Sequence, residues 1–533
     1  MTLDRKGAGD VRPGDLAVAS GRRGRARVEH VLGSAKAIEN VLEALLVQTG
    51  ARTEFEPYDP PEMSLDGRTD LRGELAFTID PETAKDFDDA LTFGEEGDGV
   101  RAFVHIADVS YFVRSGAPLD LGAAARSFST YVPGLVAPML PHELADDLCS
   151  LRPNLDRLCV TVELPPGGEP SFYRSVIRSG ARLTYGQAER ILGGRERADP
   201  PVADALRLAE RVATGLRERR FQRGALRITS PEIAFEFDGR GGVARAWRES
   251  EPHAHMLVEE LMIVANEAVA GLLAGRRREA LYRVHEQPDP QAVQLLLAKL
   301  ADLGVPTPPV PERESLSPTE AAQIAAAASD LVSDYVANAG RGREAFPTLV
   351  LRALKQARYD PRNLGHSGLA SKAYCHFTSP IRRYPDLVVH RALLTELGVG
   401  TDHVPPELEE LAEHTSERER TAATIEYQAD AICLAWLLDS VLFERGWEEP
   451  FEGEIIGVIG SGIFVRFEEV YEGFLPARKL PGDYFELNDL GTALRGRRGG
   501  RTHRLGDPIE VRVESIDRPQ GKVELDLAPR QRQ

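Results

Sequence analysis

The stretch TIDPETAKDFDDA, residues 78–90, places four aspartates at the end of an apolar, strand-like run. They are Asp80, Asp86, Asp88 and Asp89, all within ten residues. Carboxylates this close raise one another's pKa unless a cation compensates them. Hard oxygen ligands suit Mg²⁺ or Mn²⁺, and two such ions about 3.5–4 Å apart would hold a phosphodiester for hydrolysis. The stretch predicts a two-metal site for Mg²⁺, with Mn²⁺ as a substitute.

Two plainer interpretations of the same stretch stay open on residue types alone. A calcium loop of the EF-hand type, counted from Asp80, requires glycine at its sixth position and glutamate at its twelfth. This chain has Lys85 and Leu91 there, and its flanks resemble strands, so calcium is disfavoured. A solvated acidic turn is the remaining alternative.

A second stretch, HFTSPIRRYPDLVVHR at residues 376–391, contains adjacent arginines. Arg382 and Arg383 follow a Ser-Pro turn and precede an expected helix, where backbone N–H groups also favour anions. A phosphate contact is one interpretation, and a pair of surface arginines is the other. The aspartates elsewhere in the chain favour the phosphate.

Other candidate residues are ambiguous taken alone. Glu259 and Glu260 lie in an apolar helix, where a buried glutamate would need a partner, although a surface position is more common. Glu426 in TIEYQAD is equally ambiguous. Tyr131 and Tyr185 could stack on bases, but most tyrosines are half-buried packing residues.

The C-terminal region, residues 451–527, has short alternating strands punctuated by glycine and predicts a small closed barrel. Phe464 and Phe467, with Arg466 between them, suggest a stacking face for single-stranded nucleic acid. Some of its aromatic residues must instead form the core. Five arginines between 495 and 504 could follow a phosphate backbone or lie in a solvated loop.

Composition limits the class of protein. The chain has 533 residues and a net charge of −18, which is the wrong sign for a simple nucleic-acid coat but is compatible with a local basic channel. No apolar run approaches the ~20 residues that span a bilayer, no secretory signal is apparent, and four scattered cysteines form no disulfide framework. We expect a soluble, cytoplasmic protein without membrane partners.

The pattern of elements predicts an α+β protein in several parts. Strands are expected at 15–20 and 26–32, a helix at 35–49, a hairpin from 88–93 and 100–113, and helices at 256–273, 319–339, 387–397 and 407–445. The expected divisions are a short N-terminal module at 1–50, a linker at 51–72, a mixed α/β body at 73–446 and the barrel at 447–530.

The sequence resembles the ribonuclease II / ribonuclease R (RNB) family. TIDPETAKDFDDA, VHIADVSYFV, TYVPGLVAPMLPHELADDLCSLRP, YRVHEQPDP and HFTSPIRRYPDLVVHR occur in the family's order, and the similarity covers roughly residues 35–530. The resemblance implies an RNB catalytic body that encloses an RNA channel, followed by an S1-type OB-fold domain. It also implies Mg²⁺-dependent, processive 3′→5′ hydrolysis of single-stranded RNA to nucleoside 5′-monophosphates.

Residue roles follow from the same resemblance. Asp80, Asp86, Asp88 and Asp89 correspond to the family's metal-binding and catalytic aspartates. Asp88 resembles the aspartate whose loss abolishes cleavage but permits RNA binding, and Arg382 resembles the arginine that contacts the phosphate at the scissile end.

Four further residues match family positions that contact the nucleotides. Tyr131 matches the tyrosine that stacks on the 3′-terminal bases and sets the length of the final product. Tyr185 and Glu259 resemble the pair that recognises ribose over deoxyribose. Glu426 corresponds to a glutamate near the leaving nucleotide, in different surroundings.

The N-terminal region departs from the family pattern, which usually includes two cold-shock OB domains. Here about 34 residues precede the helix. This segment resembles the end of the second barrel or a small winged-helix-like substitute. We therefore expect degradation of duplexes with short 3′ overhangs, and a monomer by default. The alternative functions are a catalytically silent RNA-binding protein on the same fold and, less favoured, a DNA exonuclease.

Overall fold

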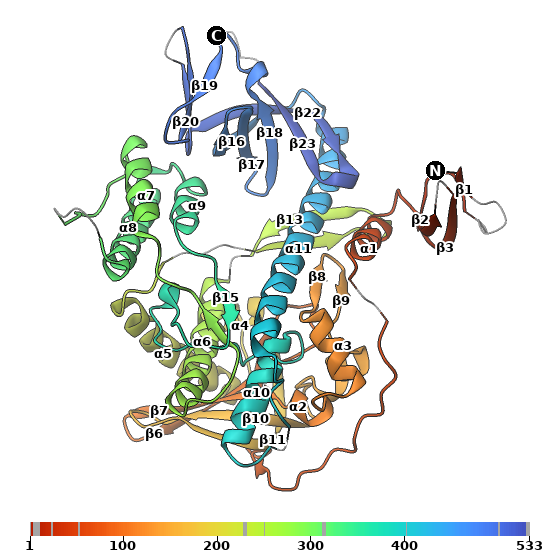
Figure 1. The fold of residues 1–533 in the computed structure, drawn as a ribbon, viewed down its shortest axis with the longest axis vertical. Helices are drawn as coiled ribbons and strands as arrows, with labels where there is room; N and C mark the ends of the chain where they lie inside the picture. The colour runs from red at the N-terminus through yellow and green to blue at the C-terminus, as the bar shows by residue number, and fades with distance from the viewer. Residues whose placement is uncertain are drawn as a thin grey trace.

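The computed structural model shows a body of mixed helices and sheets, a β-barrel at one end and a small N-terminal sheet at one side (Figure 1). Helix α11 (Leu408–Arg445) extends from the body into the barrel. Within the described ranges, no helix has the length and apolar character needed to cross a bilayer. The α+β organisation predicted from the sequence is confirmed. The described residues are 2–3, 11–22, 25–51, 54–227, 232–249, 251–311, 316–400, 402–498 and 501–528.

The N-terminal part consists of a three-stranded sheet and one amphipathic helix. Its elements are β1 (Thr2–Leu3), β2 (Asp15–Arg22), β3 (Arg25–Ser34) and α1 (Ile38–Gln48). Strand β3 lies between β1 and β2. The apolar residues of α1 recur at helical spacing and are buried in a cluster shared with α11. The next segment passes along the outside of the body and includes one short strand, β4 (Thr69–Asp70).

A six-stranded sheet forms the base of the body. Its strands are β5 (Ala76–Asp80), β6 (Asp89–Glu96), β7 (Gly99–Ala107), β10 (Asp156–Leu164) and β11 (Ser171–Thr184), together with β4. The order is β10-β7-β6-β5-β11-β4, and β10 also pairs with β11, so five strands close on themselves.

The predicted hairpin is present as β6 and β7, but the second strand ends earlier than expected. It stops at Ala107 because the next residue, Asp108, is buried and pairs with Arg68 at 2.6 Å. A short helix, α2 (Val109–Phe112), then replaces the predicted strand residues.

Helices pack against this sheet and extend the body. The predicted helices at 256–273, 319–339, 387–397 and 407–445 correspond to α6, α8, α10 and α11. Besides α2 and α11, the α-helices described in the body are α3 (Pro118–Arg126), α4 (Tyr185–Leu192), α5 (Pro200–Gln222), α6 (Pro252–Gly275), α7 (Pro290–Asp302), α8 (Pro318–Ala339), α9 (Ala345–Arg352) and α10 (Tyr384–Glu396). Short hairpins pair β8 (Thr130–Val132) with β9 (Leu135–Ala137) and β12 (Ile233–Phe237) with β13 (Val243–Arg248). A separate antiparallel pair joins β14 (Tyr282–Val284) to β15 (Arg358–Asp360), with α7, α8 and α9 between them in the chain.

The C-terminal region is a closed barrel, as the sequence predicted, and the structure shows five strands in it. The barrel strands, in the order β16-β17-β18-β23-β22, are β16 (Phe451–Ile459), β17 (Gly462–Phe467), β18 (Tyr471–Pro476), β23 (Lys522–Leu527) and β22 (Pro508–Asp517). A separate sheet contains β19 (Phe485–Leu487), β20 (Ala493–Gly496) and β21 (Thr502–Arg504). Part of the arginine-rich segment is therefore strand, and residues 499–500 lie outside the described part.

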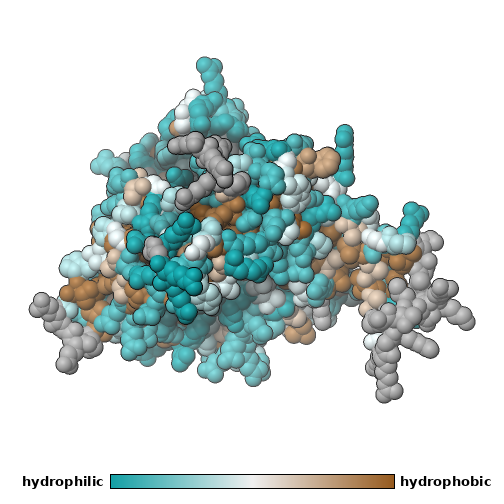
Figure 2. All heavy atoms as spheres, turned by 90° about the horizontal axis from the view of Figure 1, so that it is seen from above, coloured by the Kyte–Doolittle hydropathy of each residue, from teal (hydrophilic) through white to brown (hydrophobic). Residues whose placement is uncertain are grey.

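The barrel packs tightly against α11. Gly521 has φ of 64°, and a Cβ at this position would lie 2.6 Å from the Ala431 carbonyl carbon of α11. Only glycine satisfies both the backbone conformation and this approach. Seen from the barrel end, the surface is mainly hydrophilic with scattered apolar patches (Figure 2), in keeping with a chain that is 28% charged.

Candidate active site

The four aspartates lie around the connection between β5 and β6. Asp80 is the last residue of β5 and Asp89 is the first of β6. The loop between them is held by Ser150, whose Oγ donates to Lys85 O at 2.6 Å and accepts from Phe87 N at 3.0 Å. The loop is therefore anchored on both sides of Asp86.

Burial, with repulsion between neighbouring carboxylates, raises the pKa values of Asp80, Asp88 and Asp89. Burial, followed by the charge of Asp89, raises the pKa of Asp80 to about 7. Burial also raises the pKa of Asp89 to about 6 and that of Asp88 well above its usual range. Within the described part of the chain, Asp80 Oδ2 and Asp88 Oδ2 are buried without a hydrogen-bond partner. Orphaned carboxylate oxygens of this kind fit a divalent cation as the missing partner.

The segment before α10 brings its two arginines to different environments. Ile381 N donates to Asp88 Oδ1 at 2.8 Å, which joins this segment to the aspartates. The Arg382 side chain is 46% exposed, and its Nε lies 3.5 Å from Asp88 Oδ2. Arg383 is the N-cap residue of α10, and its Nη2 donates to the completely buried Asp386 at 2.7 Å.

Arg382 therefore remains available to a phosphate, whereas Arg383 is held within the protein. The Ser379 backbone N–H also donates to Asp386, at 2.8 Å. The direct RNA contact predicted for Arg383 does not fit this arrangement, because its guanidinium compensates a buried carboxylate. Its position supports the loop that presents Arg382.

Tyr131 and Glu426 are distant in sequence but meet beside the aspartates. The Tyr131 hydroxyl donates to Asp86 Oδ2 at 2.5 Å, and its backbone N–H donates to Glu426 Oε1 at 2.8 Å. Burial raises the pKa of Tyr131 well above its usual range and also raises the pKa of Glu426. The β8–β9 hairpin and α11 therefore contribute to one site.

Tyr185 begins α4 directly after Thr184, which pairs with Asp80 across β11 and β5. Burial, with the charges of Asp89 and Asp80, raises the pKa of this tyrosine, so its phenol stays protonated at neutral pH. Its ring stacks on His255 of α6 with a centroid distance of 4.0 Å.

Glu259 lies one helical turn after His255, so the two project from the same side of α6. Its side chain is 55% exposed and lies 3.2 Å from Arg220, and burial of its surroundings raises its pKa. The neighbouring Glu260 is the buried glutamate and pairs more closely with Arg220. Glu259 is thus the one of the two that is open to a ligand.

Sequence reasoning missed two residues of this region. Asp430 lies one turn after Glu426 on α11, and burial followed by the charge of Glu426 raises its pKa to about 7. The i,i+4 spacing of two acids in TIEYQAD was the available signal. His255 had no comparable signal, because its stacking partner is distant in the chain.

Of the two barrel phenylalanines that the sequence analysis proposed as stacking residues, only one is exposed. Phe464 is 39% exposed, but Phe467 is 1% exposed and packs against Phe451 in the barrel core. Alternation along β17 places these two rings on opposite faces. The stacking role predicted for Phe467 therefore does not fit its position.

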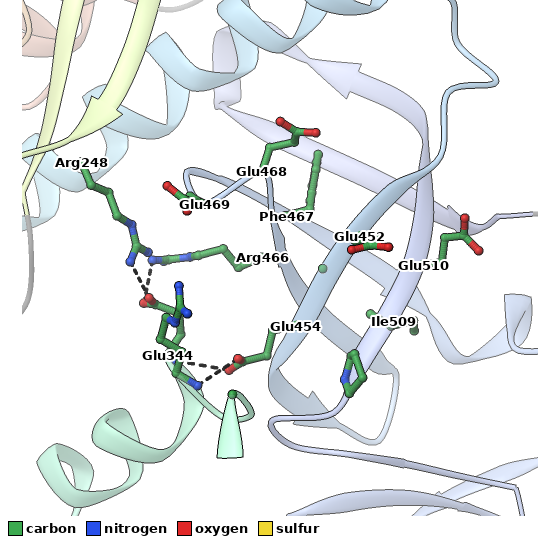
Figure 3. Close-up of a pocket in the computed structure, with 14 residues that line it drawn as sticks. Arg248, Glu344, Glu452, Glu454, Arg466, Phe467, Glu468, Glu469, Ile509 and Glu510 are labelled. Carbon is green, nitrogen blue, oxygen red and sulfur yellow. Dashed lines mark hydrogen bonds and ion pairs between the residues drawn. The ribbon is translucent and has the colours of Figure 1, made fainter. Parts of the chain in front are cut away.

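Arg466 is also unavailable as a simple phosphate contact. It pairs with Glu472 and, at 3.0 Å, with Glu344 of the body, which also pairs with Arg248 (Figure 3). Arg466, Glu344 and Arg248 line a pocket of about 790 Å³ between barrel and body, and six glutamates border it: Glu344, Glu452, Glu454, Glu468, Glu469 and Glu510. Because carboxylates predominate in this pocket, its negative potential attracts cations and disfavours binding of the RNA phosphate backbone.

Comparisons with known proteins cover nearly the whole chain. Residues 68–398 match the family model described as RNB domain, and residues 448–527 match the S1 RNA binding domain. Ribonuclease R of Escherichia coli (strain K12) is 35% identical over 547 residues, an alignment that covers 95% of this chain and 64% of that protein. Ribonuclease R of Aquifex aeolicus (strain VF5) is 36% identical, covering 94% and 72% respectively.

Solved structures show the same similarity. Mycoplasma genitalium RNase R in complex with ribose methylated single-stranded RNA has a TM-score of 0.88 and 26% identity, covering 98% of this chain and 84% of that one. The complex of the same protein with double-stranded RNA has a TM-score of 0.81 and 25% identity, covering 98% and 91%.

Proposed function

Since the chain belongs to the RNB family, we propose that it is a 3′→5′ exoribonuclease that hydrolyses single-stranded RNA processively to nucleoside 5′-monophosphates. The observation that carries this proposal is the convergence of the buried aspartates with Arg382, Tyr131 and Glu426. The relatives named ribonuclease R support the reaction and the substrate class.

Asp80, Asp86, Asp88 and Asp89 would hold two Mg²⁺ or Mn²⁺ ions, which fits their hard donors and the orphaned oxygens of Asp80 and Asp88. When bound, such ions stabilise negative charge on the phosphodiester oxygens. The chain's own part is to hold the carboxylates in place. The Ile381 N–H fixes Asp88, and the Tyr131 hydroxyl fixes Asp86.

Arg382 is the proposed contact to the scissile phosphate. Its planar guanidinium suits bidentate binding of phosphate oxygens. Its 3.5 Å separation from Asp88 is long for an ion pair, so little is lost when it turns to a substrate. Arg383 acts through Asp386 and positions the loop.

Tyr131, Glu426, Tyr185 and Glu259 are the proposed contacts to the terminal nucleotides. Tyr131 would present its ring to the 3′-terminal bases, and Glu426 would lie by the leaving nucleotide. Tyr185 and Glu259 project from neighbouring helices, where a protonated phenol and an accessible carboxylate could donate to and accept from a ribose 2′-hydroxyl.

The divisions expected from the sequence are retained as part of this proposal: a module at 1–50, a linker at 51–72, a catalytic body at 73–446 and an S1-type RNA guide at 447–530. Phe464 remains the candidate stacking residue on the guide. The complex of M. genitalium RNase R with double-stranded RNA supports testing duplexes with 3′ overhangs as substrates. A monomer remains the proposed state.

The test is a time course on 5′-labelled single-stranded RNA with Mg²⁺, using wild type and Asp88→Asn. Progressive shortening with release of 5′-monophosphates by wild type, but not by the variant, is the expected result. Asp98→Asn is the matched control, because Asp98 is exposed in the β6–β7 turn. Tight RNA binding without shortening by wild type, with either Mg²⁺ or Mn²⁺, would instead favour a silent RNA-binding protein.

A further inference from the structure

Three side chains outside the aspartate cluster gather where the loop after β13 enters α6. Glu249, Glu251 and His255 each offer one ligand atom, and these atoms all lie within 4.8 Å of one another. His255 Nε2 is 3.4 Å from Glu249 Oε2 and 3.9 Å from Glu251 Oε2. Among the described residues, no other three His, Cys, Asp or Glu side chains bring their ligand atoms this close together.

The imidazole is oriented for this arrangement. His255 stacks on Tyr185 with ring planes only 10° apart, which fixes the plane of the imidazole. Nε2 then faces the two carboxylates, and within the described ranges it makes no hydrogen bond of good geometry. The three side chains are partly exposed, so an ion can reach them from solvent.

Charge and donor type both favour a cation. Two carboxylates converge on the imidazole, and Glu232 adds further negative potential at His255 and at Tyr185. Imidazole nitrogen and carboxylate oxygen are both ligands of Zn²⁺, and carboxylate oxygen also suits Mn²⁺. This donor set differs from the aspartate cluster, whose all-oxygen donors suit Mg²⁺.

We propose that Glu249, Glu251 and His255 form an accessory site for a divalent transition-metal ion such as Mn²⁺ or Zn²⁺. An ion held there restrains His255 and, through the stack, the ring of Tyr185 beside Asp80 and Asp89. The consequence for RNA recognition rests on the proposed function, but the site itself does not. Its role is to position Tyr185 and not to take part in the reaction.

The test uses Mn²⁺ as the probe and electron spin-echo envelope modulation on the full chain without RNA. An imidazole ligand couples its ¹⁴N nucleus to the metal electron spin, whereas the aspartate cluster offers only oxygen. Wild type with Mn²⁺ in excess should show ¹⁴N modulation, and His255→Gln should lose it. Equilibrium dialysis should show weakening of one Mn²⁺ site by at least the ~10- to 100-fold typical for loss of an outer-shell partner.

His253→Gln is the matched control, because His253 lies in the same helical turn but pairs with Glu189 at 2.8 Å. It should keep the modulation. Glu249→Gln combined with Glu251→Gln should abolish it while the imidazole remains. Absence of ¹⁴N modulation in wild type, its persistence in His255→Gln, or its loss in His253→Gln would overturn the proposal. Since no turnover is measured, these outcomes are independent of whether the chain degrades RNA.

Discussion

Replacement of the adjacent residues Arg382 and Arg383 by glutamine is expected to damage the protein in two different ways. Arg383 compensates the completely buried Asp386, with a 2.7 Å contact. Removing one partner of a buried ion pair costs about 3–5 kcal/mol. We expect about 3 kcal/mol for Arg383→Gln, at the lower end, because the Ser379 backbone N–H still donates to Asp386.

Arg382→Gln should leave stability almost unchanged and impair the reaction. The side chain is 46% exposed and its one ion pair, to Asp88, spans 3.5 Å, so its loss should cost no more than about 1 kcal/mol of folding free energy. Loss of a donor to developing charge lowers kcat by about 10²–10³-fold. We expect a decrease of that size for Arg382.

Two assays separate these effects. Urea denaturation followed by circular dichroism measures the free energy of unfolding, and single-turnover cleavage of 5′-labelled RNA with Mg²⁺ measures the chemical step. Arg352→Gln is the control, because Arg352 is exposed on α9. The reasoning is refuted if Arg383→Gln retains full stability but loses cleavage, or if Arg382→Gln unfolds as easily as expected for Arg383→Gln.

Three further results are expected. Phe467→Ala should lower the free energy of unfolding by about 3–5 kcal/mol, because it leaves a cavity in the barrel core. Phe464→Ala should change stability little and weaken binding of single-stranded RNA by about 1–3 kcal/mol in a titration. Equal losses of stability in the two variants would contradict this expectation. The pKa of Asp430 is raised to about 7 in the fold, so the buried carboxylate destabilises the protein increasingly as pH rises from about 4 through 7. Asp430→Asn should therefore raise the free energy of unfolding at pH 8 by roughly 1–3 kcal/mol and change it little at pH 4. Stabilisation by this substitution at low pH only would contradict the expected sign. Gly521→Ala should lower the melting temperature of the barrel, because the φ of 64° and the 2.6 Å distance from an added Cβ to the Ala431 carbonyl carbon both disfavour a side chain. An unchanged melting curve would show that glycine is not required at this position.

Local signals in the sequence were sufficient to predict the aspartate cluster, four of the long helices and the first strand of the β6–β7 hairpin, but not the end of its second strand. Asp80, Asp86, Asp88 and Asp89 are close in sequence, so one loop brings them together whatever the remaining fold. The helix predicted at 35–49 is present as α1, and its five buried residues lie three and four apart, which places them on one face.

Other features depended on segments that are far apart in the chain. Tyr131 is 295 residues from Glu426, and His255 meets Tyr185 across two helices. No local pattern reports such contacts, since they arise when separate elements pack. The different environments of Arg382 and Arg383 belong to the same class, because the identity of each partner is set by packing.

The sequence by itself determined the order of the parts, the carboxylate cluster and the family, because repeated spacing and long motifs are local properties. Tertiary structure alone decided which of two similar neighbours is available to a ligand. Glu259 is accessible and Glu260 is buried, and Phe464 is exposed while Phe467 is in the core. Local periodicity separates the two faces of a strand or helix, but only the packing of distant elements decides which face is buried and which charge partner each residue meets.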